Sequence, residues 1–188
     1  MSRKSMLIGD MDMDRIRYTL AFIQRGDEFL VLNRNNPPNM GRWNGVGGKM
    51  EPSETPEQCV LREIYEETGL SLNAVEYRGI LIWEHLDEQG NPPQDRTGTH
   101  LFYATFPADT SYPELSVTPE GILAFKKATW LFDPANGGVA SAVACILPNI
   151  LRSSERFCYQ LVFKSTTNRL EERSLIHDIR ITPCTDAL

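Results

Sequence analysis

Hydrophobic residues along the chain gather in short runs of strand length, separated by polar segments rich in glycine and proline. Two such runs within 18–34 flank Arg25-Gly26-Asp27-Glu28, which predicts a β-hairpin. Further strands are expected over residues 74–86, 99–108, 121–131 and 156–165. Because strands and helices alternate without a regular βαβ rhythm, the pattern favours an α/β (α+β) fold in which helices flank a mixed sheet.

The clearest helix is predicted between Thr55 and Gly69. Thr55 suits the N-cap, Pro56 suits the first helical position, and Gln58 completes a Thr-x-x-Gln capping box. Gly69 supplies the C-terminal stop, since glycine readily adopts the left-handed conformation found there. This segment therefore carries both a start and a stop signal for a helix.

The remaining segments give weaker signals. A proline- and glycine-rich loop is expected over 35–45, and a turn over 87–98. A buried helix is expected over 138–152, interrupted or ended near Pro148 because proline lacks the backbone N–H that a helix interior needs. The tail after Ser165 shows no clear pattern.

Three carboxylates crowd one side of the first predicted helix. At about 100° per residue, Glu63, Glu66 and Glu67 fall within an arc of roughly 100°, beside an apolar arc that includes Val60 and Ile64. Such like charges repel one another unless a cation lies among them. Hard divalent ions such as Mg²⁺ or Mn²⁺ suit this oxygen-rich chemistry, whereas the alternative is a solvated acidic helix face.

A longer spacing pattern surrounds these carboxylates. It runs Gly48, five residues, Glu54, seven residues, Arg62-Glu63-Ile64, one residue, Glu66-Glu67, one residue, Gly69-Leu70. This spacing reproduces the Nudix box at every fixed position, and the chain resembles the Nudix hydrolase family, also called MutT-like. The hairpin, the lead-in over 41–49 and the segment 118–131 also have counterparts in MutT-type nucleotide-sanitising enzymes.

The resemblance implies an α/β/α sandwich around a mixed sheet and a hydrolase that uses Mg²⁺ or Mn²⁺. Members cleave a nucleoside diphosphate linked to another moiety, and MutT-type members convert a nucleoside triphosphate into the monophosphate and pyrophosphate. The expected domain spans 15–165, with a flexible N-terminal segment over 1–14 and a C-terminal extension of unknown role over 166–188.

The resemblance also implies a set of metal ligands. Glu63, Glu66 and Glu67 match the family's ligands. The alternative for one of them is that it activates the attacking water instead, and Glu63 is our choice for that role. Gly47 matches a glycine whose backbone carbonyl binds metal, although loop flexibility also explains a glycine there. Glu120 stands where many members carry a further ligand or base.

Two further residues of the box have implied supporting roles. Arg62 matches the arginine that orients the following glutamate through a fork-like ion pair. A plain surface pair with Glu66, one turn later, is the alternative. Glu54 resembles a glutamate that holds the box together.

Substrate-binding residues are expected outside the carboxylate cluster. Arg34 and Lys49 are placed to meet phosphates, although exposed cations are common. Asn44 resembles an asparagine that contacts the purine in eukaryotic 8-oxo-dGTP hydrolases, while satisfying a turn is the alternative. Thr19 is expected to line the same pocket. The paired aspartates that grip an oxidised base in those enzymes have no counterpart after Trp130, which leaves 8-oxo-dGTP specificity open.

Composition narrows the classes of function. The formal charge of −6 and the pI near 5.1 argue against a duplex nucleic-acid binder. The family resemblance implies a small-molecule nucleotide as the partner. No apolar run reaches the roughly 18 residues of a membrane span, and the N-terminus lacks the apolar stretch of a secretory signal. The four cysteines are scattered, which predicts reduced thiols in a cytoplasmic protein.

Several alternatives stay open from the sequence. Within the same chemistry the rival substrates are ADP-ribose, dinucleoside polyphosphates and NADH. A non-catalytic Nudix-fold regulator is a different class, but such proteins usually lose charged residues of the box, and this chain keeps all of them. Small domains of this family often dimerise, so a homodimer is also left open.

Overall fold

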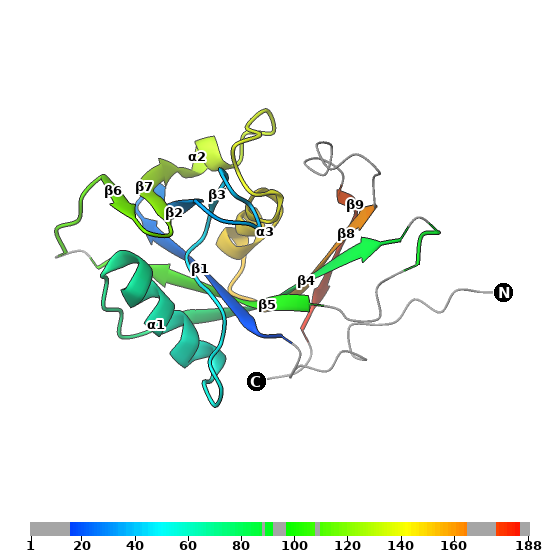
Figure 1. Cartoon of the computed structure of the whole chain (residues 1–188), viewed down its shortest axis with the longest axis horizontal. Helices are drawn as coiled ribbons and strands as arrows, with labels where there is room; N and C mark the ends of the chain where they lie inside the picture. The colour runs from blue at the N-terminus through cyan, green and yellow to red at the C-terminus, as the bar shows by residue number, and fades with distance from the viewer. Residues whose placement is uncertain (1–15, 88, 92–96, 108–109, 165–175, 185–188) are drawn as a thin grey trace.

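The computed structural model describes residues 16–87, 89–91, 97–107, 110–164 and 176–184. Its strands are β1 (Tyr18–Arg25), β2 (Glu28–Arg34), β3 (Trp43–Asn44), β4 (Glu76–Leu86), β5 (Thr97–Thr105), β6 (Leu115–Thr118), β7 (Gly121–Lys127), β8 (Phe157–Lys164) and β9 (Ile176–Pro183). Within these residues the strands form one sheet in the order β6-β7-β2-β1-β5-β4-β8-β9, with β3 paired to β2 (Figure 1). The β1–β5 and β4–β8 pairs are parallel and the others antiparallel, which confirms the expected mixed sheet.

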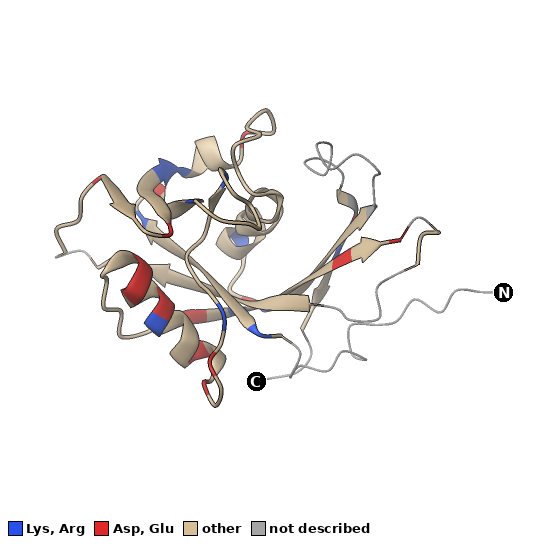
Figure 2. Ribbon diagram, viewed as in Figure 1, with Lys and Arg blue, Asp and Glu red and all other residues tan. Residues whose placement is uncertain are grey.

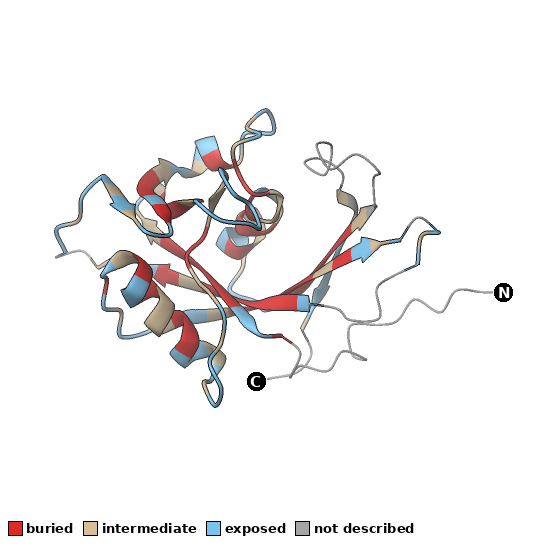
Figure 3. Ribbon diagram, in the orientation of Figure 1, coloured by how far each residue is buried: buried red, intermediate tan, exposed pale blue. Residues whose placement is uncertain are grey.

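Helices cover both faces of this sheet. The helices are α1 (Pro56–Thr68), α2 (Ala128–Leu131) and α3 (Ser141–Arg152). Val60 and Ile64 of α1 belong to a buried cluster with Ile23 of β1, and Val143 of α3 belongs to a second buried cluster with Phe22. Because Phe22 and Ile23 are neighbours on one strand, their side chains point to opposite faces. The α/β/α sandwich is therefore confirmed, with buried residues running along the central strands (Figure 3).

The local signals for the first helix and the hairpin are confirmed. Thr55 Oγ1 accepts from the Gln58 N–H at 3.2 Å, and the Gln58 side chain accepts from the Thr55 N–H at 2.9 Å. Gly69 ends α1 with a φ of 75°. The hairpin closes at the Arg25–Glu28 pair, between β1 and β2.

Three expectations about secondary structure are wrong in part. Residues 128–131 form the short helix α2 instead of continuing strand β7, and β3 lies within the predicted loop 35–45. Helix α3 continues through Pro148 to Arg152. Pro148 leaves the carbonyl of Ala144 without its helical donor, but Ala144 is exposed, so water can satisfy that carbonyl. Buried side chains before and after Pro148 hold the helix on the sheet.

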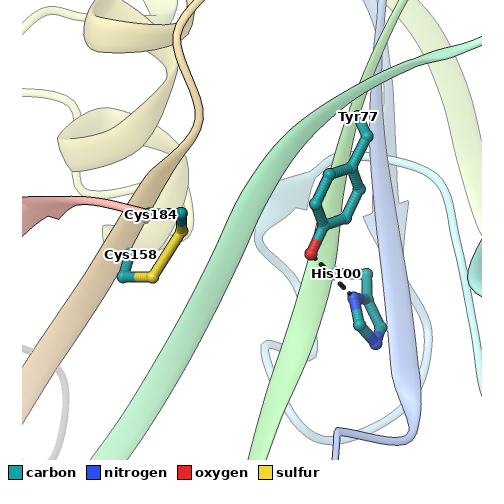
Figure 4. The surroundings of a disulfide bond; sticks show 4 residues. All are labelled: Tyr77, His100, Cys158 and Cys184. Carbon is teal, nitrogen blue, oxygen red and sulfur yellow. Dashed lines mark hydrogen bonds between the residues drawn. A yellow bond between two sulfur atoms is a disulfide. The ribbon is translucent and has the colours of Figure 1, made fainter. Parts of the chain in front are cut away.

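A disulfide bond joins Cys158 of β8 to Cys184, which follows β9 (Figure 4). The expectation of reduced thiols is therefore wrong for this pair, while Cys59 and Cys145 are free. The two bonded residues are 26 positions apart in sequence, and the antiparallel β8–β9 pairing brings their Cα atoms to 5.6 Å. Sequence spacing alone did not show this pairing.

The predicted domain limits, residues 15 and 165, fall at or beyond the edges of the described ranges. Residues 1–14 lie outside the described part of the chain, and so does the boundary at 165/166. Within the predicted extension, residues 176–183 form the edge strand β9. None of the helices in the described ranges is long and apolar enough to cross a membrane.

His100 is a buried histidine of β5, paired with Ile80 of β4, and Figure 4 shows it beside Tyr77 in the region of the disulfide. His100 is only 3% exposed, and its Nδ1 lies 3.1 Å from the hydroxyl of Tyr77. Burial lowers the pKa of His100 to about 4, although a hydrogen bond to the Ile16 backbone opposes the shift. His100 is therefore neutral at physiological pH, and the unfolded chain takes up a proton there more readily than the folded protein.

This difference predicts a pH-dependent stability. Because the folded-state pKa is depressed below 6.5, the free energy of unfolding should fall as the pH drops from about 6.5 to about 4, by on the order of 3 kcal/mol. Urea unfolding across this range would measure the loss. His100→Gln should flatten the dependence, whereas His85→Gln, at an exposed histidine of β4, should leave it unchanged. An equally steep dependence in His100→Gln would contradict the assignment.

Candidate active site

A cavity of about 380 Å³ opens where the end of β2, the β6–β7 turn, the loop before α1 and α1 itself meet. It is lined by Arg34, Gly47, Gly48, Lys49, Glu63, Glu66, Glu67, Thr118, Pro119 and Glu120. All five predicted metal ligands and both predicted phosphate-binding cations are among these residues. Figure 2 shows the acidic residues gathered on α1.

Backbone pairing holds the loop before α1 against β1. The N–H groups of Ala21 and Val46 donate to each other's carbonyls at 2.7 and 3.1 Å, and the Thr19 N–H donates to the Gly48 carbonyl at 2.9 Å. Gly47 has a φ of 149°, and a Cβ atom there would overlap the carbonyl oxygen of Thr19. Glycine is therefore required at position 47 by conformation and by space.

The same loop contacts two carboxylates of α1. The Gly47 N–H donates to Glu67 Oε2 at 3.0 Å. A Cβ atom on Gly48 would overlap the carboxylate of Glu63. The two glycines thus let the backbone approach the helix closely enough for its carboxylates to lie directly against the loop.

Arg62 is the centre of the ion-pair network at this site. Its Nε and Nη2 donate to the two oxygens of Glu54 at 2.7 and 2.9 Å, and its Nη1 donates to Glu63 and Glu66, both at 2.9 Å. Nη2 also donates to the Lys49 carbonyl at 3.1 Å. The fork on Glu54, chiefly through these hydrogen bonds, lowers the pKa of that carboxyl to about 2. One guanidinium therefore joins the loop before α1 to the carboxylates of the helix.

The two most buried carboxylates of the site carry raised pKa values. Burial raises the pKa of Glu67 to about 7, against the stabilising hydrogen bond from the Gly47 N–H, and nearby Glu63 and Glu120 add to the rise. Burial also raises the pKa of Glu63, although Arg62 opposes it. Ionised carboxylates in this setting are costly without a cation, so the site favours a positive ligand.

The donor set fits a hard divalent ion that shares its coordination with a substrate. Within the described residues, no three acidic, histidine or cysteine side chains converge as a ready-made cage, since Arg62 holds Glu63 and Glu66. Mg²⁺ commonly takes one or two carboxylates together with waters and substrate phosphates instead of an all-protein cage. An oxygen-lined cavity of this kind is compatible with that mode of binding.

Arg34 gives the cavity a cationic donor. Its Nε is buried and has no hydrogen-bond partner among the described residues. Arg34 also lines the cavity, so its guanidinium brings positive charge to the wall that faces the carboxylates of α1.

Two predicted substrate contacts lie elsewhere. The expectation that Thr19 lines the pocket is wrong, because Thr19 is 3% exposed and its Oγ1 lies 3.4 Å from Cys59 Sγ beneath α1. Asn44 is outside the cavity lining, and its Oδ1 accepts from the Gly45 N–H at 3.0 Å. The lining residues Thr118 and Pro119 were missed, although they directly precede Glu120 and that proximity was the available signal.

The chain is similar in sequence to a known domain family and to curated proteins. Residues 14–133 match the NUDIX domain family. NAD-capped RNA hydrolase NudC of Haemophilus influenzae is 39% identical over 72 residues, which are 37% of this chain and 27% of the relative. Oxidized purine nucleoside triphosphate hydrolase of Mus musculus is 33% identical over 87 residues, which are 46% of this chain and 53% of the relative. The chain thus spans about half or less of these curated relatives.

Solved structures share the fold over more of the chain. A MutT protein from Bacillus halodurans superposes with a TM-score of 0.69 and 26% identity, covering 88% of this chain and 96% of that one. A bifunctional NMN adenylyltransferase/ADP ribose pyrophosphatase from Francisella tularensis gives a TM-score of 0.54 at 19% identity, over 77% of this chain and 43% of that one. The latter likeness shows the fold alone.

The close contact between Gly47 and the Thr19 carbonyl predicts that the loop before α1 tolerates no side chain at position 47. Gly47→Ala should lower the free energy of unfolding by more than about 1 kcal/mol, because a Cβ there meets backbone and the φ is unfavourable. Gly137→Ala is the matched control, since a Cβ at Gly137 meets nothing within 4 Å. Urea unfolding measures both variants, and equal stabilities would contradict the packing of the loop on β1.

Proposed function

The chain belongs to the Nudix family, and from this we propose that it is a divalent-metal-dependent hydrolase that converts a nucleoside triphosphate into the monophosphate and pyrophosphate. One observation carries the proposal. The carboxylates of Glu63, Glu66, Glu67 and Glu120 share a single cavity with Arg34 and Lys49, so the proposed metal ligands and the proposed phosphate-binding cations line one space. An anionic phosphate chain and a divalent ion complement these opposite charges.

Mg²⁺ or Mn²⁺ would be held by the carboxylates of Glu66, Glu67 and Glu120, together with the backbone carbonyl of Gly47, while Glu63 would instead serve the attacking water. When bound, the ion supplies positive charge that offsets the charge of the carboxylates and of the phosphate oxygens. The raised pKa values of Glu63 and Glu67 in the metal-free protein support a cation at this position.

The protein's own residues would then perform the following steps. Arg34 and Lys49 bind the phosphate chain through their positive charges, since both residues line the cavity. Glu63 accepts a proton from the water whose oxygen attacks phosphorus, and the bridging P–O bond breaks as the leaving group departs with its electron pair. Arg62 holds Glu63 in place during this step.

The relatives support two substrate classes. The name of the mouse relative supports a nucleoside triphosphate, including an oxidised purine such as 8-oxo-dGTP. The NudC relatives, at 39% identity, support a dinucleotide joined through a pyrophosphate as the second candidate. The two classes yield different products, because pyrophosphate leaves only from the triphosphate.

A nucleotide panel tests the proposal directly. The protein is incubated with dGTP, 8-oxo-dGTP, NADH, ADP-ribose and a dinucleoside tetraphosphate, each with Mg²⁺ or Mn²⁺. Pyrophosphate, phosphate and mononucleotides are quantified separately. Pyrophosphate with a monophosphate supports the leading proposal, whereas two mononucleotides favour the second candidate. No hydrolysis of any member would favour a non-catalytic regulator.

The carboxylates provide the first mutational prediction. Glu63→Gln and Glu67→Gln should each lower kcat by about 10²-fold or more, because each loses an anionic oxygen needed for the ion or the proton. Glu57→Gln is the matched control, since Glu57 is on the same helix but exposed and outside the cavity. Circular dichroism verifies folding, and a Glu67→Gln enzyme as active as wild type would refute the metal-site assignment.

The second mutational prediction concerns Asn44 and recognition of the base. Asn44→Ala should change the ratio of kcat/KM between purine and pyrimidine triphosphates by more than it changes kcat/KM for any one of them. The reason is that an amide can pair with a ring nitrogen and an exocyclic group of a base at the same time. Equal losses on every nucleotide would argue that Asn44 only supports the Gly45 turn.

A further inference from the structure

Thr19 lies beneath the cavity, between the two parts of the site. It is a buried residue of β1, and a substrate in the cavity cannot reach its side chain. Its contacts go to the glycine loop on one side and to α1 on the other. Thr19 is therefore placed to set the position of one part relative to the other.

The backbone of Thr19 contacts the loop at two points. Its N–H donates to the Gly48 carbonyl at 2.9 Å. Its carbonyl oxygen fills the space where Gly47 lacks a side chain. The loop that contacts Glu63 and Glu67 is thus fixed on Thr19 itself.

The side chain of Thr19 contacts the helix. Oγ1 lies 3.4 Å from the Sγ of Cys59, which is fully buried in α1. Nη2 of Arg62 donates to the same sulfur at 3.6 Å. Burial raises the pKa of the Cys59 thiol to about 11, so the thiol stays protonated and can donate to Thr19 while its sulfur accepts from Arg62.

We propose that Thr19 is a positioning residue, which acts through Cys59 and Arg62 to hold the α1 carboxylates at the correct distance from the Gly47–Gly48 loop. The inference rests on the proposed function, because it concerns the same site. Metal binding and catalysis both weaken when the groups that contact the ion or the substrate are displaced even slightly. A residue that holds the α1 carboxylates in place therefore affects both. Pure packing would need only the shape of threonine, whereas this role needs its hydroxyl.

Substitutions can separate the hydroxyl from the shape. Thr19→Val keeps the shape and removes the hydroxyl, and Thr19→Ser keeps the hydroxyl. Thr99→Val is the matched control, because Thr99 is a buried threonine of the adjacent strand β5 whose Oγ1 donates to the His100 carbonyl at 3.4 Å. Cys59→Ala removes the proposed intermediary.

Mn²⁺ affinity without substrate is the primary measurement, made by electron paramagnetic resonance. Thr19→Val should weaken Mn²⁺ binding by about three- to tenfold, as expected for one lost hydrogen bond. The kcat for pyrophosphate release should fall by a similar factor with an unchanged KM. Thr19→Ser and Thr99→Val should stay close to wild type. In the metal-free protein, amide exchange at Gly47 should be faster in Thr19→Val but unchanged in Thr19→Ser and Thr99→Val.

The proposed role of Cys59 as the link between Thr19 and Arg62 gives a second prediction. Cys59→Ala should reproduce the loss seen in Thr19→Val, and the double variant should lose no more than either single one. Additive losses would contradict a connection through the sulfur. Wild-type Mn²⁺ affinity and kcat in Thr19→Val, or equal losses in Thr99→Val, would overturn the inference.

The outcomes also separate this inference from the proposed function. A wild-type protein that binds Mn²⁺ but hydrolyses no nucleotide would refute the proposed function, while the Mn²⁺ affinities of the variants would still decide the role of Thr19. A wild-type protein that binds no Mn²⁺ would refute both.

Discussion

The guanidinium of Arg62 is the feature on which the rest of the site depends. It holds Glu54, Glu63 and Glu66 and also donates to the Lys49 carbonyl, so it joins the loop before α1 to the helix. Without that charge, neighbouring carboxylates on one helix face would repel one another. Arginine is suited to this place because its five donors lie in a rigid plane, so it grips both oxygens of Glu54 while it also donates to Glu63 and Glu66.

The cavity around this network is assembled from four distant segments. Antiparallel pairing of β2 with β7 sets Arg34 opposite Gly121, and the Asn35 N–H donates to the Glu120 carbonyl at 2.9 Å. This register brings Glu120 beside the carboxylates of α1, where it contributes to the raised pKa of Glu67. The glycine loop closes the cavity because it lacks side chains where it crosses β1 and meets α1.

Local signals predicted much of the fold. The capping box, the Gly69 stop and the two-residue turn of the hairpin depend on neighbours within a few positions, and the structure has all three. Features that depend on packing were predicted less well. Helix α3 passes through Pro148 because the sheet holds its buried face, and Cys158 bonds Cys184 because β9 pairs with β8.

The sequence by itself determined the chemistry of the carboxylates, because the spacing of Glu63, Glu66 and Glu67 places them on one face of any α-helix. Only the tertiary structure decided what surrounds them. It placed Arg34 and Glu120 in the same cavity, and it turned Thr19 inward to Cys59 instead of toward a substrate. The reason is physical: helical spacing is a local property of the backbone, whereas strand register and the burial of one side chain depend on contacts between residues far apart in the chain.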